Sequence, residues 1–304
     1  MSYFSNQNLR ERVQFVPGRW VAADLHIHSS YSGGSLTPAE LLVMAGMQLL
    51  EIIGFADHGQ VEGVFEGERM AETNPGFPLV ISTQEISLGD HFHLLAVGSR
   101  ESFGGDNRKQ LLEKLTSHHE HGGAVILGHP WTVPKTGWAA DCLRELLDGS
   151  MIDGIELFNA SLLDLPRGES LLRPVWEEII LPYRLGITGG SDFHYHRQGG
   201  RRLGTGRTYL KVNIPGVSGI IEALRERRTV AGMFSYRPFD LGCFGSGYHV
   251  LLGNDPWSGQ LNGMIAALRQ RIDRLSKLNP EKRKALNRLT AWGYYQLAAD
   301  LAEG

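Results

Sequence analysis

The chain has little cysteine and no excess of charge of one sign. Its 304 residues contain two cysteines, Cys142 and Cys243, which excludes both a disulfide framework and a cysteine-based zinc site. The formal net charge is −3, so no overall positive field argues for nucleic acid as a partner. What the chain does have is a 42% hydrophobic fraction, which is ordinary for a globular protein with a sizeable core.

Long apolar runs are also missing. The first twenty residues lack the apolar core that a secretory signal requires. The most apolar stretch, residues 41–56, is interrupted by Gln48 and Glu51. It falls short of the roughly 20 apolar residues that a membrane-spanning helix needs. We therefore expect a cytoplasmic protein with no membrane partner.

Strand-like and helix-like segments alternate from Trp20 to about Phe234. Residues 91–98 are predicted to pair with residues 77–88 across a turn at Gly89-Asp90. Short apolar strands that alternate with helices predict an α/β fold with a parallel, barrel-like sheet.

One helix start is strongly marked in the sequence. Thr37 is a favourable N-cap, Pro38 suits the first helical position, and Glu40 stands three residues after the cap. This arrangement is a capping box, and it predicts a helix that begins at residue 38.

The pattern changes after Arg237, where a Gly-rich stretch begins. Beyond it, apolar residues spaced three or four apart predict a helix: Leu261, Ile265, Leu268, Ile272 and Leu275. A second helix over 280–303 would complete a hairpin that either packs on the barrel or mediates a homodimer. The predicted organisation is an N-terminal extension (1–19), a barrel (20–235) and a C-terminal segment (236–304).

Potential metal ligands stand at the predicted ends of nearly every strand. These ends read DLHIH, ADHG, TQEIS, FHLL, GHP, IELFN and GSDFH. His26 and His28 are two residues apart, so in a strand both imidazoles face the same side, as do Asp192 and His194. A barrel places its active site at the C-terminal ends of its strands. Imidazole and carboxylate are ligands for Zn, Mn or Fe, so the sequence predicts a polynuclear metal site.

This ordered series resembles the polymerase and histidinol phosphatase (PHP) family of metal-dependent phosphoesterases. The resemblance covers roughly residues 20–212 and rests on DLHIHSSYS, FADHG, QEIS, HLLAVG, GHP and GSDFH. It implies a distorted (β/α)7 barrel of the PHP type with two or three divalent ions, Zn, Mn or Fe.

The resemblance also implies the ligands, which are the imidazoles and carboxylates at the strand ends: His26, His28, His58, Glu85, His93, His129, Asp192 and His194. Glu85 would bridge the first and second ions, while His58 and His194 would belong to the third. Gly33 stands where the family usually has an aspartate that completes the third site. We therefore expect two strongly bound ions and a third that is weaker or absent. Asp57 is expected to orient one of the histidines.

The implied reaction is hydrolysis of a small phosphomonoester or phosphodiester by a metal-bridged hydroxide. The substrate would be a nucleotide, an oligonucleotide end or a sugar phosphate. Asp192 would accept the proton of the attacking water, and His194 would assist the leaving group. Candidate substrate contacts are the cationic and aromatic residues of two loops beside the metal strands: Arg202, Arg207, Trp131 and Lys135.

Two other functions stay open at this point. The same metal centre can hydrolyse a carboxyl ester, an amide or a carbamate, since an activated water attacks carbon as well as phosphorus. The absence of an aspartate at Gly33 favours this alternative, because a third ion mainly serves phosphate. A non-catalytic metal-binding module is the other alternative.

Overall fold

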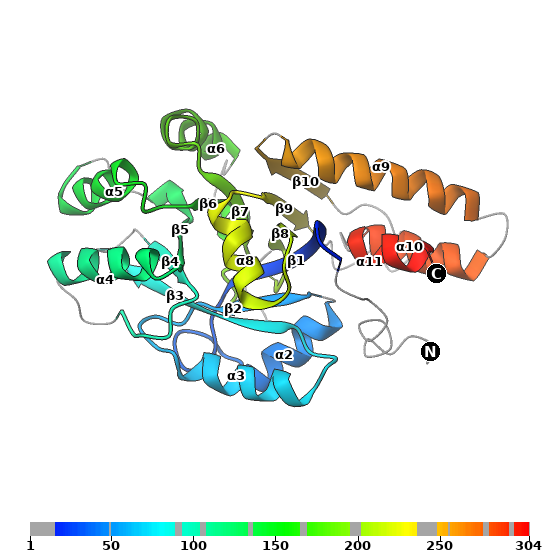
Figure 1. Cartoon of the computed structure of the whole chain (residues 1–304), viewed down its shortest axis with the longest axis horizontal. Coiled ribbons are helices and arrows are strands. Elements are labelled where there is room, and N and C mark those ends of the chain that lie inside the picture. Colours follow the sequence, from blue (N-terminus) through cyan, green and yellow to red (C-terminus); the bar gives the residue numbers. More distant parts are fainter. Residues whose placement is uncertain are drawn as a thin grey trace.

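A ten-stranded sheet organises the described part of the chain (Figure 1). The computed structural model describes residues 16–48, 50–88, 93–103, 108–132, 136–164, 169–194, 202–235, 248–254, 256–275, 280–291 and 295–303. The strands are β1 (Arg19–Ile27), β2 (Ile52–Phe55), β3 (Leu79–Ser87), β4 (His93–Val97), β5 (Ala124–Gly128), β6 (Gly154–Asn159), β7 (Gly186–Gly190), β8 (Gly206–Val212), β9 (Thr229–Ser235) and β10 (Tyr248–Gly253). Their spatial order is β10-β9-β8-β1-β2-β3-β4-β5-β6-β7.

The strands β1 to β7 follow one another around a nearly closed barrel. The pairs β1–β2, β2–β3, β5–β6 and β6–β7 are parallel, while β4 is antiparallel to both β3 and β5. An isolated parallel bridge between Ile27 and Phe193 brings the end of β7 back to β1. The expected α/β, barrel-like fold is confirmed, as is the pairing of β3 with β4. The turn expected at Gly89-Asp90 lies outside the described residues.

Helices flank the sheet between most of its strands: α2 (Pro38–Met47), α3 (Glu62–Thr73), α4 (Arg108–Glu120), α5 (Trp138–Asp148), α6 (Glu169–Val175), α7 (Leu181–Tyr183) and α8 (Gly216–Arg225). Short helical turns η1 (Pro130–Thr132), η2 (Ala160–Asp164) and η3 (Trp176–Ile180) complete them. The capping box of α2 is confirmed. The Glu40 amide donates to the Thr37 hydroxyl (3.3 Å), and the Thr37 amide donates to the Glu40 carboxylate (2.9 Å).

The interior of the barrel is apolar at one end and polar at the other. Val21 and Ala23, at the start of β1, pack in one buried cluster with Ile220 and Leu224 of α8. The helix α8 therefore covers the end of the barrel where β1 begins. His26 near the end of β1 and His28 directly after it lie at the opposite end, where the parallel strands finish.

The C-terminal region extends the same sheet and adds helices beside it. Strand β10 pairs with β9, so the sheet continues past residue 235. The helix expected over 280–303 is two helices in the structure, which follow α9 (Trp257–Leu275): α10 (Pro280–Ala291) and α11 (Tyr295–Glu303).

These helices pack on the barrel through its first strand. Leu261 and Tyr295 share a buried cluster with Trp20 of β1, and Arg19 forms an ion pair with Asp300 (3.3 Å). This packing accounts for the apolar stripe of α9 without a second copy, and dimerisation stays a prediction. In the described part of the chain, every helix is too short or too polar to cross a membrane.

Candidate metal centre

Backbone hydrogen bonds between strand ends hold the candidate ligands together. The amide of Asp192 donates to the carbonyl of His26, and the amide of His28 donates to the carbonyl of Phe193, both at 2.9 Å. These two bonds place the segment after β7 directly beside the end of β1. Asp192 has a φ of 49°, a left-handed conformation that is rare and strained for a non-glycine residue and is frequent at functional sites.

The first group of potential ligands is fully enclosed. It comprises His26, His28, Glu85 and Asp192, which are all buried. The His28 Nε2 atom lies 3.0 Å from Glu85 Oε2, and the Nε2 atoms of His26 and His28 each lie 3.6 Å from Asp192 Oδ1. Two ligands that each bind a tetrahedral zinc ion at about 2.1 Å are themselves about 3.4 Å apart. The group therefore has the size of a metal site.

Several ring nitrogens at this centre lack a hydrogen-bond partner among the described residues. They are His26 Nε2, both ring nitrogens of His28, and His58 Nδ1. Carboxylate oxygens of Glu85 and Asp192 lie 3.0–3.6 Å from the Nε2 atoms of His26 and His28, but they form no hydrogen bonds with them. Leaving buried polar atoms unsatisfied costs about 1–3 kcal/mol each in proteins. A divalent cation bound among them would remove that cost, so the donor set fits a metal.

The second group consists of Glu85, His93 and His129. The Oε1 atom of Glu85 lies 2.5 Å from His93 Nδ1 and 3.1 Å from His129 Nε2, and the two ring nitrogens are 3.0 Å apart. The other oxygen of Glu85 faces His28. One carboxylate is therefore shared by both groups, which is the arrangement expected of a bridging ligand. The buried cluster could bind more than one metal ion.

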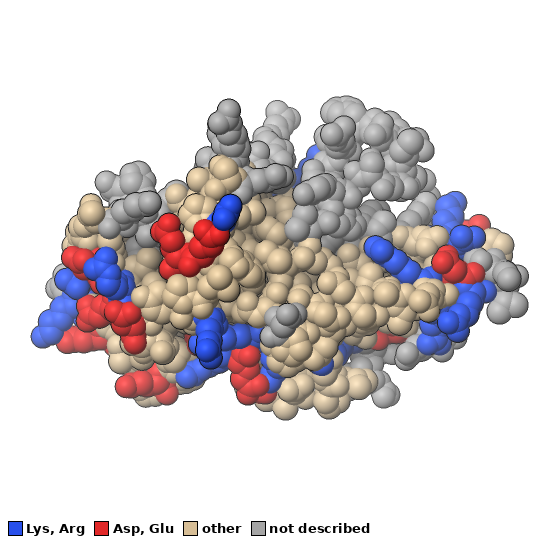
Figure 2. Space-filling view, turned by 90° about the horizontal axis from the view of Figure 1, so that it is seen from above, with Lys and Arg blue, Asp and Glu red and all other residues tan. Residues whose placement is uncertain are grey.

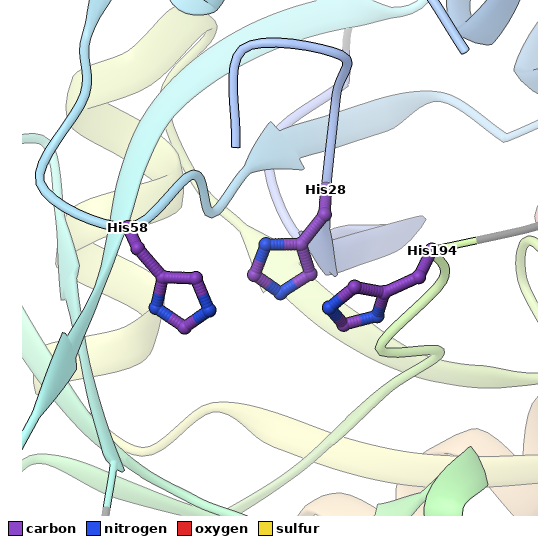
Figure 3. Close-up of side chains that lie close together, drawn as sticks. All are labelled: His28, His58 and His194. Carbon is purple, nitrogen blue, oxygen red and sulfur yellow. The ribbon is translucent and has the colours of Figure 1, made fainter. Parts of the chain in front are cut away.

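The third group is looser than the other two. The ring of His28 lies between those of His58 and His194 (Figure 3), with ring centres 5.0 Å and 4.0 Å away. His58 and His194 were expected here, and His28 is the third member that sequence reasoning assigned to the first group alone. The rings of His28 and His194 are stacked at 25°, so their in-plane lone pairs do not converge well on one ion.

Gly33 borders this third group. A Cβ atom added at Gly33 would lie 3.2 Å from Cδ2 of His194. A side chain at this position would therefore reach the ring, as the sequence comparison with the family motif implied. Because glycine offers no donor there, the histidines of the third group gain no carboxylate from this loop.

The charges of the centre shift its pKa values strongly. Burial disfavours the charged form of His28, but Asp192 and Glu85 outweigh it and raise the pKa of His28 to about 9. Burial also raises the pKa of Glu85, yet the surrounding imidazoles, His26 first, hold this pKa well below its usual range. By contrast, burial and the neighbouring His28 lower the pKa of His194 to about 4.

This low pKa bears on the expected role of His194. The ring is neutral at neutral pH, and its Nδ1 lies 3.0 Å from the carbonyl oxygen of Asp192. Donation from Nδ1 to that carbonyl leaves Nε2 as a lone-pair donor. This geometry suits a ligand better than an acid that protonates a leaving group, and the catalytic role of His194 stays a prediction.

Glu156, within β6, is a functional candidate that sequence reasoning did not assign. It is buried, and its Oε2 atom lies 3.0 Å from His26 Nδ1. The same oxygen accepts hydrogen bonds from the side-chain amide of Asn159 (3.0 Å) and from the backbone amide of His129 (3.3 Å). Glu156 therefore touches one member of each of the first two groups. The segment IELFN was noted as a polar strand end, which was the available signal.

Two buried aspartates hold the surrounding loops. Asp24 accepts hydrogen bonds from the amides of Ser191 (3.0 Å) and Gly204 (2.7 Å), which ties β1 to the segment before Asp192. Burial raises the pKa of Asp24 to about 6.

Asp57 was expected to orient a histidine, and this is wrong. Its carboxylate instead accepts from the amide (2.7 Å) and the hydroxyl (2.6 Å) of Ser29, which fixes the loop after His28.

The expected substrate contacts are placed unequally. Trp131 lies in η1 with its ring centre 6.5 Å from that of His129, and Arg202 is exposed. Arg207 is fully buried in β8, and its Nε donates to the carbonyl of Gly204 (2.8 Å). That position indicates a structural role for Arg207, because its side chain does not reach the surface. Lys135 lies outside the described residues.

The structure is thus a barrel with a cluster of His, Glu and Asp side chains at the C-terminal ends of its strands, and this cluster could bind several metal ions. No family model matches the sequence. The solved structure of a two-domain protein from Bacteroides vulgatus, which contains a predicted PHP-like metal-dependent phosphoesterase, aligns with a TM-score of 0.56 and 22% identity. The alignment covers 71% of this chain and 67% of that one. The resemblance to the PHP family is thereby confirmed at the level of the fold.

Two further similarities are weaker. An uncharacterized protein of Methanocaldococcus jannaschii is 28% identical over 149 residues, which cover 45% of this chain and 81% of that protein. The structure of an amidohydrolase from Chromobacterium violaceum aligns with a TM-score of 0.44 and 17% identity, over 67% of this chain and 96% of that one.

Proposed function

We propose that this chain is a metal-dependent phosphoesterase that hydrolyses a small phosphomonoester or phosphodiester. The observation that carries the proposal is the sharing of Glu85 between two compact donor groups, His26/His28/Asp192 and His93/His129. Two adjacent divalent ions lower the pKa of a bound water and neutralise charge that develops on a phosphoryl oxygen. Zn, Mn or Fe suits this set of imidazoles and carboxylates.

In this proposal the two compact groups supply both the ligands and the proton acceptor. Glu85, His26, His28, His93 and His129 hold the first two ions, and Asp192 completes the first set. The imidazoles of the centre favour the ionised carboxylate of Asp192, and its pKa lies below the usual range although burial opposes this. Asp192 is therefore available to accept a proton from the attacking water.

The third group contributes less in our proposal. His58 and His194, with His28 between them, would hold a weaker third ion or contact the substrate directly. We propose Trp131 and Arg202 as substrate contacts, since Trp131 is beside His129 and Arg202 is exposed on the loop before β8. A nucleotide, an oligonucleotide end or a sugar phosphate would suit an aromatic and a cationic contact.

A substrate panel with metal analysis tests the proposal. Protein loaded with Mn or Zn should hydrolyse bis(p-nitrophenyl) phosphate or p-nitrophenyl phosphate, and elemental analysis should return about two ions per chain. Asp192→Asn should lower kcat by about 10²-fold or more, as expected for loss of a general base. His121→Gln is a matched control, because His121 is an exposed histidine directly after α4 that contacts Ser117 and not the centre.

The second candidate function is hydrolysis of a carboxyl ester, an amide or a carbamate. The observation that favours it is the glycine at position 33, which leaves the third group without a carboxylate. In this case p-nitrophenyl acetate would be hydrolysed in preference to both phosphate esters. A metal-loaded chain that hydrolyses none of the three probes would support the non-catalytic alternative.

A further inference from the structure

The C-terminal helices carry a concentration of positive charge that the whole-chain balance hides. Residues 257–291 include eight Lys or Arg residues and two acidic ones, whereas the chain as a whole has a net charge of −3. Five of the basic residues are exposed on α9 and α10: Arg269, Arg271, Arg274, Arg283 and Lys284. Figure 2 shows Lys and Arg gathered at the end of the molecule formed by these two helices.

The two helices bring basic residues together where α9 ends and α10 begins. Arg283 of α10 lies 4.0 Å from Asp273 of α9, so the start of α10 is next to the last turns of α9. Arg269 stands one helical turn before Asp273 and therefore on the same face. The acidic side chain of Asp273 is largely exposed (76%), and a 4.0 Å pair between exposed groups contributes little energy, so the exposed cations dominate the charge of this surface.

The apolar side of α9 is already occupied. Ile265, Leu268 and Ile272 are buried against the protein. The exposed positions between them are small or polar, such as Ala266 and Gln270. A helix that binds a lipid bilayer needs a free apolar face to insert. This face has none among its described residues, so it fits a polyanion in water better than a membrane.

We propose that the basic exposed surface of α9 and α10, made by Arg269, Arg271, Arg274, Arg283 and Lys284, binds the phosphate backbone of a single-stranded nucleic acid. Arg and Lys neutralise phosphates at regular spacing along such a strand, and this requires no groove or base-specific pocket. Binding at this face does not require hydrolysis at the metal centre, which lies at the strand ends of the barrel.

Salt dependence of binding tests this proposal directly. The probe is a fluorescent 20-nucleotide oligothymidylate, and the readout is its anisotropy with the full chain between 50 and 200 mM salt. If five phosphates are contacted, the affinity should fall about 100-fold over this range, and the triple variant R269Q/R274Q/K284Q should show a fall of only about sevenfold.

The control variant is K109Q/R144Q/R173Q. It also removes three exposed positive charges, which pair with acids on α4, α5 and η3. It should bind the oligonucleotide like the unaltered chain. Equal weakening by both triple variants, or an affinity independent of salt, would overturn the proposal.

Two further measurements separate the remaining outcomes. Binding to phosphatidylserine vesicles without binding to the oligonucleotide would indicate a membrane partner and would overturn the nucleic-acid proposal. Asp192→Asn should bind the oligonucleotide as tightly as the unaltered chain. Loss of phosphoesterase activity and loss of nucleic-acid binding are thus observed independently.

Discussion

Replacing Glu156 by glutamine tests how far metal affinity depends on a residue outside the proposed ligand set. The carboxylate oxygen Oε2 contacts the His26 ring, the Asn159 amide and the backbone amide of His129, at 3.0, 3.0 and 3.3 Å. A carboxylate that accepts from Nδ1 holds the ring of His26 in place and leaves Nε2 free to bind a metal. Glutamine keeps the size of the side chain but removes its charge.

The expected loss of metal-binding free energy in Glu156→Gln follows from these contacts. A hydrogen bond to a charged group contributes about 1.5–3 kcal/mol and one between neutral groups about 0.5–1.5 kcal/mol. Losing the charge should therefore weaken metal binding by about 1–2 kcal/mol, which agrees with the tenfold to hundredfold loss usual for such residues. Competition against a chromophoric chelator measures this affinity without any activity assay.

The control for this experiment is Glu51→Gln. Glu51 accepts from Arg19 (2.6 Å) and from the amide of Ala22 (3.1 Å), near the other end of β1. This variant should lose some thermal stability and keep its metal affinity. A folded Glu156→Gln protein that binds both ions as tightly as the unaltered chain would refute the positioning role. Asn159→Ala, which keeps the carboxylate, should give a smaller loss.

Three further predictions follow from the same centre. Gly33→Asp should raise the metal content from about two to about three ions per chain, whereas Gly33→Ala, equally strained at φ 79°, should not; elemental analysis decides between them. Gly190→Ala should destabilise the fold by about 1–3 kcal/mol and reduce metal binding, because the alanine Cβ would lie too close to Glu156 Oε1. Chemical denaturation measures the loss of stability, and metal titration measures the loss of affinity. The pKa of His28 is raised to about 9, so the metal-free ring is protonated at neutral pH. Metal binding should therefore release at least one proton and become stronger as pH rises toward 9. Calorimetry in buffers of different ionisation heat measures this release, and a result of no released proton would contradict the prediction.

The ligand positions could be anticipated from the sequence because strand geometry is periodic. His26 and His28 share a face since alternate residues of a strand point the same way, and parallel strands end at one edge of the barrel. The structure brings all eight expected residues together in three groups, and the third group also includes His28, which the family motif implied for the first group alone. Whether each binds metal stays a prediction that elemental analysis tests.

Other features depend on contacts that no local pattern encodes. The sequence places Arg207 in a Gly-rich loop, where a cation is expected to be exposed. In the structure Arg207 belongs to β8, which pairs with β1 and β9, and its side chain is buried. Asp57 follows a strand end like the ligands do, but the chain turns so that its carboxylate meets Ser29. In each case the partner is distant in sequence, and only the folded chain reveals it.

Two glycines, Gly33 and Gly190, determine which side chains fit around the centre. At position 190, glycine leaves room for Glu156 beside His26, since a Cβ atom there would lie 2.2 Å from Oε1 of Glu156. At position 33, it leaves space beside His194 that a donor could have filled. The first glycine allows the carboxylate that orients the compact groups, and the second withholds a ligand from the loose one. These two glycines underlie our prediction of two strongly bound ions and a third that is weaker or absent.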